Sequence, residues 1–280
     1  MNKAKIAKSA YRTAIYVILI ASSAVLLIPF AWMVSSSLLS EEEMFQHPPV
    51  WIPKPPHWSN YKEAWEALPF TTFLINTLLL TIGRVLPQVF ACSLVAFGFA
   101  RLRARASSKL FFLCLATMML PGQVTMIPTY IIFNKLGWVN TFKPLIVPSF
   151  FAGPFFVFML RQFFLTIPLE LDEAARIDGA SSFQIYYKIF LPLAKPALGA
   201  VAIFSFMAAW NDFMGPLIYL HDIEKYPLAL GLRLFQSYGE YATRWNLIMA
   251  SSVAMVLPPL IVFFFTQKHF IKGITIGAFR

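Results

Sequence analysis

Charged residues are scarce in this sequence. Asp, Glu, Lys and Arg make up 13% of the 280 residues, about half of their usual share in a soluble domain. Hydrophobic residues make up 58% of the chain, and the mean hydropathy is +0.65. Because a soluble domain of this size needs more charge to cover its surface, the composition excludes a soluble globular enzyme. The hydrophobic content also excludes a disordered or collagen-like chain.

Motifs of enzymes, metal centres and disulfide frameworks are lacking too. The chain has no Gly-x4-Gly-Lys-Ser/Thr, so it lacks the loop that cradles the phosphates of ATP. It also has no Gly-x-Ser-x-Gly, His-Glu-x-x-His or Cys-x-x-Cys. Its two cysteines, Cys92 and Cys114, lie in apolar segments, and its four histidines show no metal spacing. We therefore expect no enzymatic activity, no metal site and no cofactor.

Long stretches without charge are what the sequence does contain. Residues 13–40, 110–134 and 245–267 have no Asp, Glu, Lys or Arg, and residues 67–100 have only Arg84. Each stretch exceeds the roughly 20 residues that a helix needs to cross about 30 Å of hydrocarbon. Together with two shorter stretches they predict an all-α membrane protein with six transmembrane helices, at about residues 14–38, 72–100, 110–133, 144–164, 193–218 and 245–267. The first stretch is too long for a cleaved signal peptide and is expected to be retained.

The distribution of Lys and Arg predicts the orientation of these helices. The two tails and the loops 101–109 and 165–192, with their flanks, hold 15 of the basic residues, and the loops on the other side hold 7. Basic residues gather on the cytoplasmic side of a membrane. The net charge of +10 is therefore a topology signal rather than a sign of nucleic-acid binding. We expect a multi-pass protein of the plasma (inner) membrane with cytoplasmic tails at 1–13 and 269–280, and with an acidic, proline-rich extracytoplasmic loop at 39–71.

The cytoplasmic segment 165–192 is longer than a simple connection requires. Its first part has the pattern of a short helix: Pro168 suits a first turn, and acidic residues follow at the positive end of the helix dipole, namely Glu170, Asp172 and Glu173. Gly179 is a natural C-terminal stop. The pattern predicts one short helix that ends at this glycine.

A second short helix is expected directly afterwards. Ser181 and Gln184 have the spacing of a capping box, and the helix is expected over Phe183–Phe190, ended by Pro192. It carries several apolar residues, among them Phe183, Ile185, Tyr186 and Tyr187. A solvated connector does not account for these residues. A docking element does, and an amphipathic helix on the membrane surface does almost as well.

The same segment resembles a known motif. Glu173-Ala174-Ala175, Gly179 and the later Ile189-x-Leu191-Pro192 match the EAA motif of binding-protein-dependent ABC importer permeases. Other stretches resemble the carbohydrate-uptake branch of that family, which contains the smaller maltose permease subunit: Trp51-Ile52-Pro53, Asn60-Tyr61, Asp178-Gly179-Ala180-Ser181, Trp210-Asn211-Asp212-Phe213 and Gly273-Ile274-Thr275-Ile276-Gly277-Ala278. The resemblance covers nearly the whole chain.

The resemblance implies a type I ABC importer permease fold, with a permease core over 72–268, and an ATP-driven import of a sugar or oligosaccharide. It implies that Glu173 pairs with a basic group of a cytoplasmic ATPase, that Ala174 and Ala175 allow close approach, and that Gly179 makes the bend. Ile189, Leu191 and Pro192 complete the ATPase-coupling set. The implied partners are a second homologous permease subunit, two ATPase subunits that hydrolyse the ATP, an extracytoplasmic solute-binding protein, the sugar substrate and membrane lipid.

Candidate residues for the substrate pathway are fewer. Arg84 lies within a predicted span, where an unpaired charge is costly; it either lines the pathway or has a structural partner, such as an acid or a carbonyl. Trp210, Asn211 and Asp212 lie near the outer end of the fifth span and could stack on and hydrogen-bond a sugar. Trp210 is equally expected as part of an interfacial aromatic belt.

Three alternative functions remain open from the sequence. A proton-coupled secondary transporter would require several acids within the membrane, and Asp212 alone qualifies. A membrane scaffold is opposed chiefly by the EAA motif. An ABC importer permease could also serve a non-sugar solute, such as a glycerol phosphate ester.

Overall fold

The regular secondary structure is all helical in the part of the chain that the computed structural model describes, residues 3–102, 104–237 and 244–278. Side chains are described for residues 11–235, except 103, and for 244–267. The side chains of residues 269–280 in the predicted C-terminal tail, and residues 238–243 of the last predicted outer loop, therefore lie outside this description. The elements are α1 (Lys3–Ser36), α2 (Glu41–Met44), α3 (Ser59–Ala67), α4 (Phe70–Arg101), α5 (Ser107–Ala116), η1 (Thr117–Met119), α6 (Gly122–Lys135), α7 (Lys143–Ile146), η2 (Val147–Phe150), α8 (Pro154–Leu165), α9 (Glu170–Ile177), α10 (Ser182–Ile185), η3 (Tyr186–Phe190), α11 (Leu191–Leu193), α12 (Lys195–Trp210), α13 (Met214–Tyr219), η4 (Ile223–Lys225), α14 (Leu228–Ser237) and α15 (Trp245–Ala278).

Two compact units make up the chain, and each is described by itself. The first comprises Met1–Leu68 and Leu232–Val256. Its helix α1 is apolar on all sides, and residues 11–31 are exposed, as expected of a helix that faces lipid. The chain after α1 is held by Asn60 of α3, whose amide donates to the carbonyls of Ser37 and Leu39 at 3.0 and 2.8 Å.

Three charged residues also join elements of this unit. Arg244, directly before α15, donates a hydrogen bond to Glu63 of α3 and lies 3.6 Å from the carboxylate of Glu41 in α2. These contacts tie the segment 39–71 to the beginning of the last long helix.

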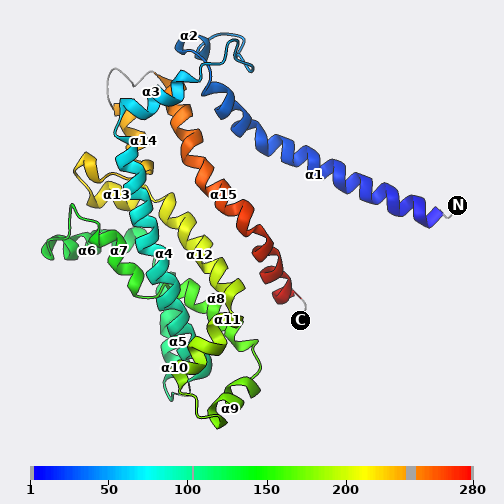
Figure 1. Ribbon diagram of the computed structural model, residues 1–280, viewed down its shortest axis with the longest axis vertical. Helices are drawn as coiled ribbons and strands as arrows, with labels where there is room; N and C mark the ends of the chain where they lie inside the picture. The colour runs from blue at the N-terminus through cyan, green and yellow to red at the C-terminus, as the bar shows by residue number, and fades with distance from the viewer. Residues whose placement is uncertain (1–2, 103, 238–243, 279–280) are drawn as a thin grey trace. The chain divides into compact units, whose positions relative to one another are not determined.

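The second unit comprises Pro69–Gly231 and Leu257–Arg280. Its main core lies where α4, α8 and α12 pack side by side (Figure 1). The buried side chains of this core include Cys92, Ala96, Phe97, Val157, Leu160, Phe164, Ile185, Tyr186, Phe190 and Val201. A smaller core around Leu80, Leu145, Tyr219 and Leu220 fixes α7 and α13 against the first half of α4.

The predicted spans are confirmed as apolar helices, but not all of them are continuous. Four are long enough to cross a membrane: Tyr11–Ser36, Phe70–Arg101, Lys143–Leu165 and Trp245–Gln267. The predicted third span, 110–133, is a bent pair in which Ser107–Met119 and Gly122–Lys135 meet at 98°, so the expectation of one continuous helix is wrong there. The predicted fifth span, 193–218, consists of α12 and α13 with a break at residues 211–213. A bend of 78° at its beginning separates Ser182–Leu193 from Lys195–Trp210.

Proline accounts for the first of these breaks. Pro121 has no N–H to donate, and it disfavours the helical conformation for the residue before it. Leu120 accordingly adopts an extended backbone with φ −82° and ψ 114°. The apolar run in the sequence continues through this point, so hydropathy alone does not reveal the bend.

Candidate functional site

The first helix of the EAA loop, defined here as residues 165–192, is α9. Its first turn contains the predicted acidic residues Glu170, Asp172 and Glu173, which face the positive end of the helix dipole. The expectation that Pro168 occupies the first turn is wrong, because the helix begins at Glu170. Leu169 is the N-cap instead, and its carbonyl accepts hydrogen bonds from the backbone N–H groups of Asp172 and Glu173 at 3.0 and 3.1 Å.

Gly179 ends this helix as predicted. Its φ is +80°, in the left-handed region that favours glycine. The N–H of Gly179 donates to the Arg176 carbonyl at 3.0 Å, and that of Ala180 donates to the Ala175 carbonyl at 2.9 Å. This pair of bonds is a Schellman motif. A Cβ at position 179 would meet no atom within 4 Å, so the position requires glycine for its backbone conformation and not for lack of space.

The second helix begins as predicted and ends differently. Ser181 accepts a hydrogen bond from the backbone of Gln184, and the Gln184 side chain accepts one from the N–H of Ser181, which completes the capping box. Pro192 does not end the helical segment, because it lies in the first turn of α11, where proline is well tolerated. Helical backbone continues to Leu193, and the bend follows at Ala194.

Apolar residues of the EAA loop divide between the core and the surface. Ile185, Tyr186 and Phe190 are buried against α4, and the Tyr186 hydroxyl hydrogen-bonds to that of Ser93 at 2.7 Å. Three others are mostly exposed: Ile177 by 87%, Phe183 by 62% and Tyr187 by 63%. The loop is thus fixed to the protein core by one set of apolar side chains and presents another set outward.

The motif residues follow the same division. Glu173, Ala174, Gly179 and Pro192 are exposed, whereas Ala175, Ile189 and Leu191 are half-buried and pack on the main core. Within the described part of the chain, the side chain of Glu173 takes part in no hydrogen bond or ion pair. The exposed acid lies on the outward side of α9, where a partner's cation could reach it.

Arg101 is a residue of this site that the sequence did not single out. It is the last residue of α4, and its side chain is only 2% exposed. One of its terminal nitrogens, Nη2, donates to the carbonyls of Phe164 at 2.6 Å and of Ile167. Its guanidinium carbon lies 4.8 Å from the centroid of the Phe190 ring. The sequence did contain a signal, because Arg101 is a cation directly after a predicted span. The count of basic residues used it only to predict the orientation of the helices.

Asp172 completes the surroundings of Arg101. Burial raises the pKa of the Asp172 carboxyl above its ordinary value of 3.8, although the charges of Arg101 and Arg176 oppose the shift. The Nε of Arg101 lies 3.8 Å from Oδ2 of Asp172. Neither this Nε nor Asp172 Oδ1 has a hydrogen-bond partner in the described part of the chain. The contact therefore compensates only partly for the loss of solvation.

The structure brings two of the pathway candidates together. Nη1 of Arg84, within α4, donates to Oδ2 of Asp212 at 2.6 Å, across 128 residues of sequence. The two side chains are 23% and 21% exposed. Oδ1 of Asp212 also accepts a hydrogen bond from the N–H of Gly215 at 3.0 Å. Arg84 therefore has the acidic structural partner that was one of its two alternatives. The other alternative, a role in the pathway, is compatible with this pairing because the pair is not fully buried.

The other two pathway candidates are placed differently. Trp210, the last residue of α12, is 2% exposed and stacks on Phe206 with ring centroids 5.5 Å apart. Asn211 is exposed, and its amide donates to the Met207 carbonyl at 2.9 Å. In this conformation Asn211 is accessible to a solute, whereas stacking of a sugar on Trp210 would require the ring to be uncovered.

A pocket of about 410 Å³ lies between α6 and α13 and is linked to the Arg84–Asp212 pair through Gly215. Gly215, which donates to Asp212, is among its lining residues. The remaining lining comes from α6 and α13: Gly122, Gln123, Thr125, Met126, Thr129, Met214, Ile218 and Tyr219. Its volume is in the range of small-molecule sites, and several of its side chains can hydrogen-bond.

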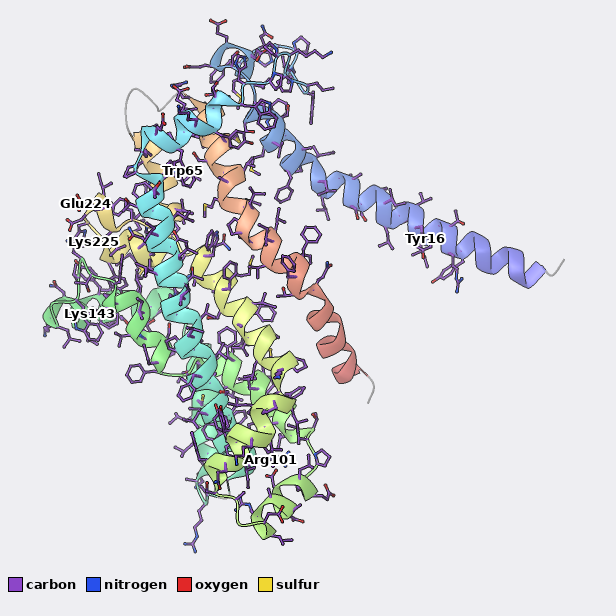
Figure 2. All side chains as sticks on the ribbon, in the orientation of Figure 1. Tyr16, Trp65, Arg101, Lys143, Glu224 and Lys225 are labelled. Carbon is purple, nitrogen blue, oxygen red and sulfur yellow. The ribbon has the colours of Figure 1, made fainter. Side chains whose placement is uncertain are left out.

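The EAA loop and the loops predicted on the opposite membrane side lie at different ends of the second unit. Figure 1 shows α9 and α10 at the Arg101 end of α4, and α6, α7 and α13 beside its other half. In Figure 2, Lys143, Glu224 and Lys225 likewise lie far from Arg101. The Asn140 amide donates to Asp222 at 2.8 Å, which joins the third and fifth predicted loops. Within the second unit, the third and fifth predicted loops therefore lie together and away from the EAA loop.

Among the residues described, no group of three or more His, Cys, Asp or Glu side chains could hold a metal ion.

Sequence comparison identifies the family. Residues 89–276, more than half of the chain, match the family described as binding-protein-dependent transport system inner membrane component. The chain belongs to this family. The permease is 31% identical over 270 residues to the probable ABC transporter permease protein YurM of Bacillus subtilis, covering 96% of this chain and 88% of that protein. It is 30% identical over 265 residues to the sn-glycerol-3-phosphate transport system permease protein UgpE of Pectobacterium atrosepticum, covering 92% and 94%.

A solved structure supports the same fold. The permease superposes with a TM-score of 0.83 and 25% identity on a chain from the crystal structure of a bacterial ABC transporter involved in the import of the acidic polysaccharide alginate. The match covers 94% of this chain and 98% of that one. The predicted type I ABC importer permease fold is confirmed, and the chain is a transport subunit of an ABC importer.

Proposed function

We propose that this permease forms half of the translocation pathway of an ATP-driven importer for neutral sugars or oligosaccharides. It pairs with a second, homologous permease subunit, and two cytoplasmic ATPase subunits hydrolyse the ATP. An extracytoplasmic solute-binding protein delivers the sugar. The observation that carries the proposal is the structure of the EAA loop. Its second helix is fixed to the core, and its first helix ends in a glycine with positive φ. One acidic residue, Glu173, and three large apolar residues, Ile177, Phe183 and Tyr187, are exposed.

The exposed part of the loop has the composition of a docking surface. Ile177, Phe183 and Tyr187 expose large apolar side chains next to Glu173 and Gly179, which form no part of the core. An exposed apolar group of this kind, rimmed by polar residues, is typical of a protein interaction site. A membrane-surface helix would direct Ile185 and Tyr186 to lipid as well, but both are buried in the protein. These facts favour a cytoplasmic ATPase as the occupant, with both termini of the chain on that same side of the membrane.

Charge at the predicted pathway favours a neutral solute. The charge of Arg84 is balanced by Asp212 at 2.6 Å, so the pair offers both a donor and an acceptor without a net charge. Hydroxyl groups can bind to both partners. A phosphate ester would be favoured by an unbalanced arginine or lysine, so the pair argues against a glycerol phosphate ester as the substrate. The adjoining pocket, with Gln123, Thr125 and Thr129, suits hydroxyl groups in the same way.

The proposal is tested with two variants of the EAA loop, Glu173→Ala and Gly179→Val, in vesicles that also hold the ATPase and the loaded binding protein. Both variants should insert normally, and both should lose most of the stimulation of ATP hydrolysis and of sugar uptake. Gly179→Val forces a β-branched residue to a φ of +80°, which strains the backbone by about 1–2 kcal/mol and redirects the second helix. The ATPase should also co-purify less well with this variant.

Matched controls exist for both changes. Glu170→Ala removes another exposed acid from the first turn of α9, and Gly137→Val places the same strain at a φ of +66° in a loop that the topology puts outside the cell. Both controls should keep stimulation. Uptake at wild-type rates by Glu173→Ala and Gly179→Val would refute the proposal, and gradient-driven uptake without any ATPase would favour a secondary transporter. Competition by sn-glycerol 3-phosphate, but not by a panel of neutral sugars, would overturn the substrate class alone.

A further inference from the structure

We propose that Arg101 is a positioning residue that fastens the EAA loop to α4, so that a displacement of the loop is passed along α4 to the Arg84–Asp212 pair. This inference rests on the proposed coupling of the EAA loop to an ATPase, and it concerns the path by which that movement enters the membrane.

The first observation is how many segments one side chain joins. Arg101 ends α4, Phe164 lies in the last turn of α8, and Ile167 lies in the connection to α9. The guanidinium donates to both carbonyls and also contacts Asp172 of α9 and the Phe190 ring of η3. A single buried group therefore contacts both helical parts of the EAA loop and the two transmembrane helices nearest to it.

The second observation concerns the two carbonyls that accept hydrogen bonds from Arg101. The last carbonyls of a helix have no partner within the helix, and a cation there is favoured by the helix dipole. Phe164 and Ile167 are both buried. The Phe164 carbonyl also accepts from the N–H of Ile167 at 3.2 Å, and Arg101 adds a second hydrogen bond to it. For the Ile167 carbonyl, Arg101 is the donor that the described part of the chain provides, and a buried carbonyl without a donor would be costly. Arginine suits the position because its planar fork can donate in two directions while its face stacks on an aromatic ring.

The third observation is that α4 extends directly from this contact to the predicted pathway. Arg84 precedes Arg101 by 17 residues in the same helix, which corresponds to roughly 26 Å at 1.5 Å per residue. The opposite partner, Asp212, follows the end of α12, which itself begins just after the EAA loop. Rigid helices of this kind can carry energetic coupling between distant sites. Through Arg101, the EAA loop can move α4 in addition to α12, the two elements that hold the ion pair.

Arg101→Gln and Arg101→Lys test the inference, with Arg105→Gln as the control. Arg105 is an exposed cation on the same predicted side of the membrane. Arg101→Gln should insert, and it should retain the ATPase on co-purification, because the exposed docking residues are unchanged. Stimulation of ATP hydrolysis by the loaded binding protein should fall about tenfold, within the usual range of coupling between two sites. Arg101→Lys keeps the charge and one donor nitrogen but loses the planar fork, so stimulation should fall about threefold. Arg105→Gln should behave as wild type.

A distance measurement separates positioning from general destabilisation. Spin labels at Ile177 and Phe90, both exposed, report the distance between α9 and α4 by double electron–electron resonance in a cysteine-free background. The distance distribution should be narrow in the wild type and in Arg105→Gln, and broad in Arg101→Gln. A narrow distribution in Arg101→Gln, or a broad one with full stimulation, would overturn the inference.

If Arg101→Gln fails to insert, the test rests on Arg101→Lys. Wild-type stimulation of ATP hydrolysis and a distance distribution as narrow as that of the wild type in Arg101→Lys would refute the need for the arginine fork. Glu173→Ala is assayed in parallel. If it remains coupled, the proposed function fails; if it uncouples while Arg101→Gln does not, only the role of Arg101 fails.

Discussion

Separating the charges of Arg84 and Asp212 should reveal whether the pair serves only the fold or also the solute. Asp212→Asn removes the negative charge but keeps an oxygen that can accept the hydrogen bond from Gly215. Arg84→Gln removes the positive charge. Each single variant leaves one charge without its partner, and the double variant leaves none.

The magnitude follows from the burial of the pair. Two unit charges about 4 Å apart attract by about 4 kcal/mol at an effective dielectric constant of about 20, before desolvation is subtracted. Breaking a fully buried pair costs about 3–5 kcal/mol. Because these side chains are 23% and 21% exposed, we expect about 2 kcal/mol for each single variant. That corresponds to a fall of roughly 4–8 °C in unfolding temperature.

The assay is a double-mutant cycle that records two quantities. Thermal unfolding of the purified complex in detergent gives stability, and uptake by reconstituted vesicles gives transport. The double variant should recover most of the lost stability, because no isolated charge remains. It should not recover uptake, because the donor and acceptor proposed to contact the sugar are both changed. Recovery of both quantities would show that the pair is only structural and would refute its place in the pathway. No loss of stability in either single variant would refute the energetic reasoning.

Two further predictions concern topology and acid. With single cysteines in a cysteine-free background, an impermeant thiol reagent applied to intact cells should label Ser59→Cys and not Ser182→Cys; the reverse pattern would invert the proposed orientation. The hydrogen bond from Arg244 lowers the pKa of Glu63 below its ordinary 4.5, so the pair stabilises the fold above that pH and loses this contribution as the pH falls through the lowered pKa. Glu63 is 45% exposed, so Glu63→Gln should lower the free energy of unfolding by only about 0.5 kcal/mol at neutral pH. In acid, the unfolding temperature of this variant should converge with that of the wild type. A constant difference at all pH values would contradict this assignment.

Helix ends in the EAA loop show how far local sequence rules extend. The Ser181–Gln184 capping box and the stop at Gly179 were predicted correctly, because each depends on the conformation of a few neighbouring residues. Pro168 and Pro192 were placed wrongly. Proline is compatible with both the residue before a helix and its first turn, so its presence does not fix the boundary on its own.

Bends within spans were missed for a related reason. Hydropathy sums the apolar character of a segment and is insensitive to a change in direction, so the 98° bend at Leu120 and Pro121 lies inside one uncharged stretch. A proline in an apolar run indicates a possible break, but α4 contains Pro87 and continues as one helix to Arg101. Packing against neighbouring helices determines which of the two occurs.

The sequence by itself determined the class of protein, the apolar segments and the EAA motif, and it predicted the alternation of loops. The apolar segments depend on the free energy of transfer of each segment from water to lipid. The predicted loop positions depend on the number of charges in each loop, and the motif depends on residues that are close together in the sequence. The tertiary structure alone decided that Arg84 meets Asp212 across 128 residues and that Arg101 is buried among α4, α8 and both helical parts of the EAA loop. Ion pairs and buried hydrogen bonds depend on distances of about 3 Å, and such distances between remote residues are set only when the helices have packed.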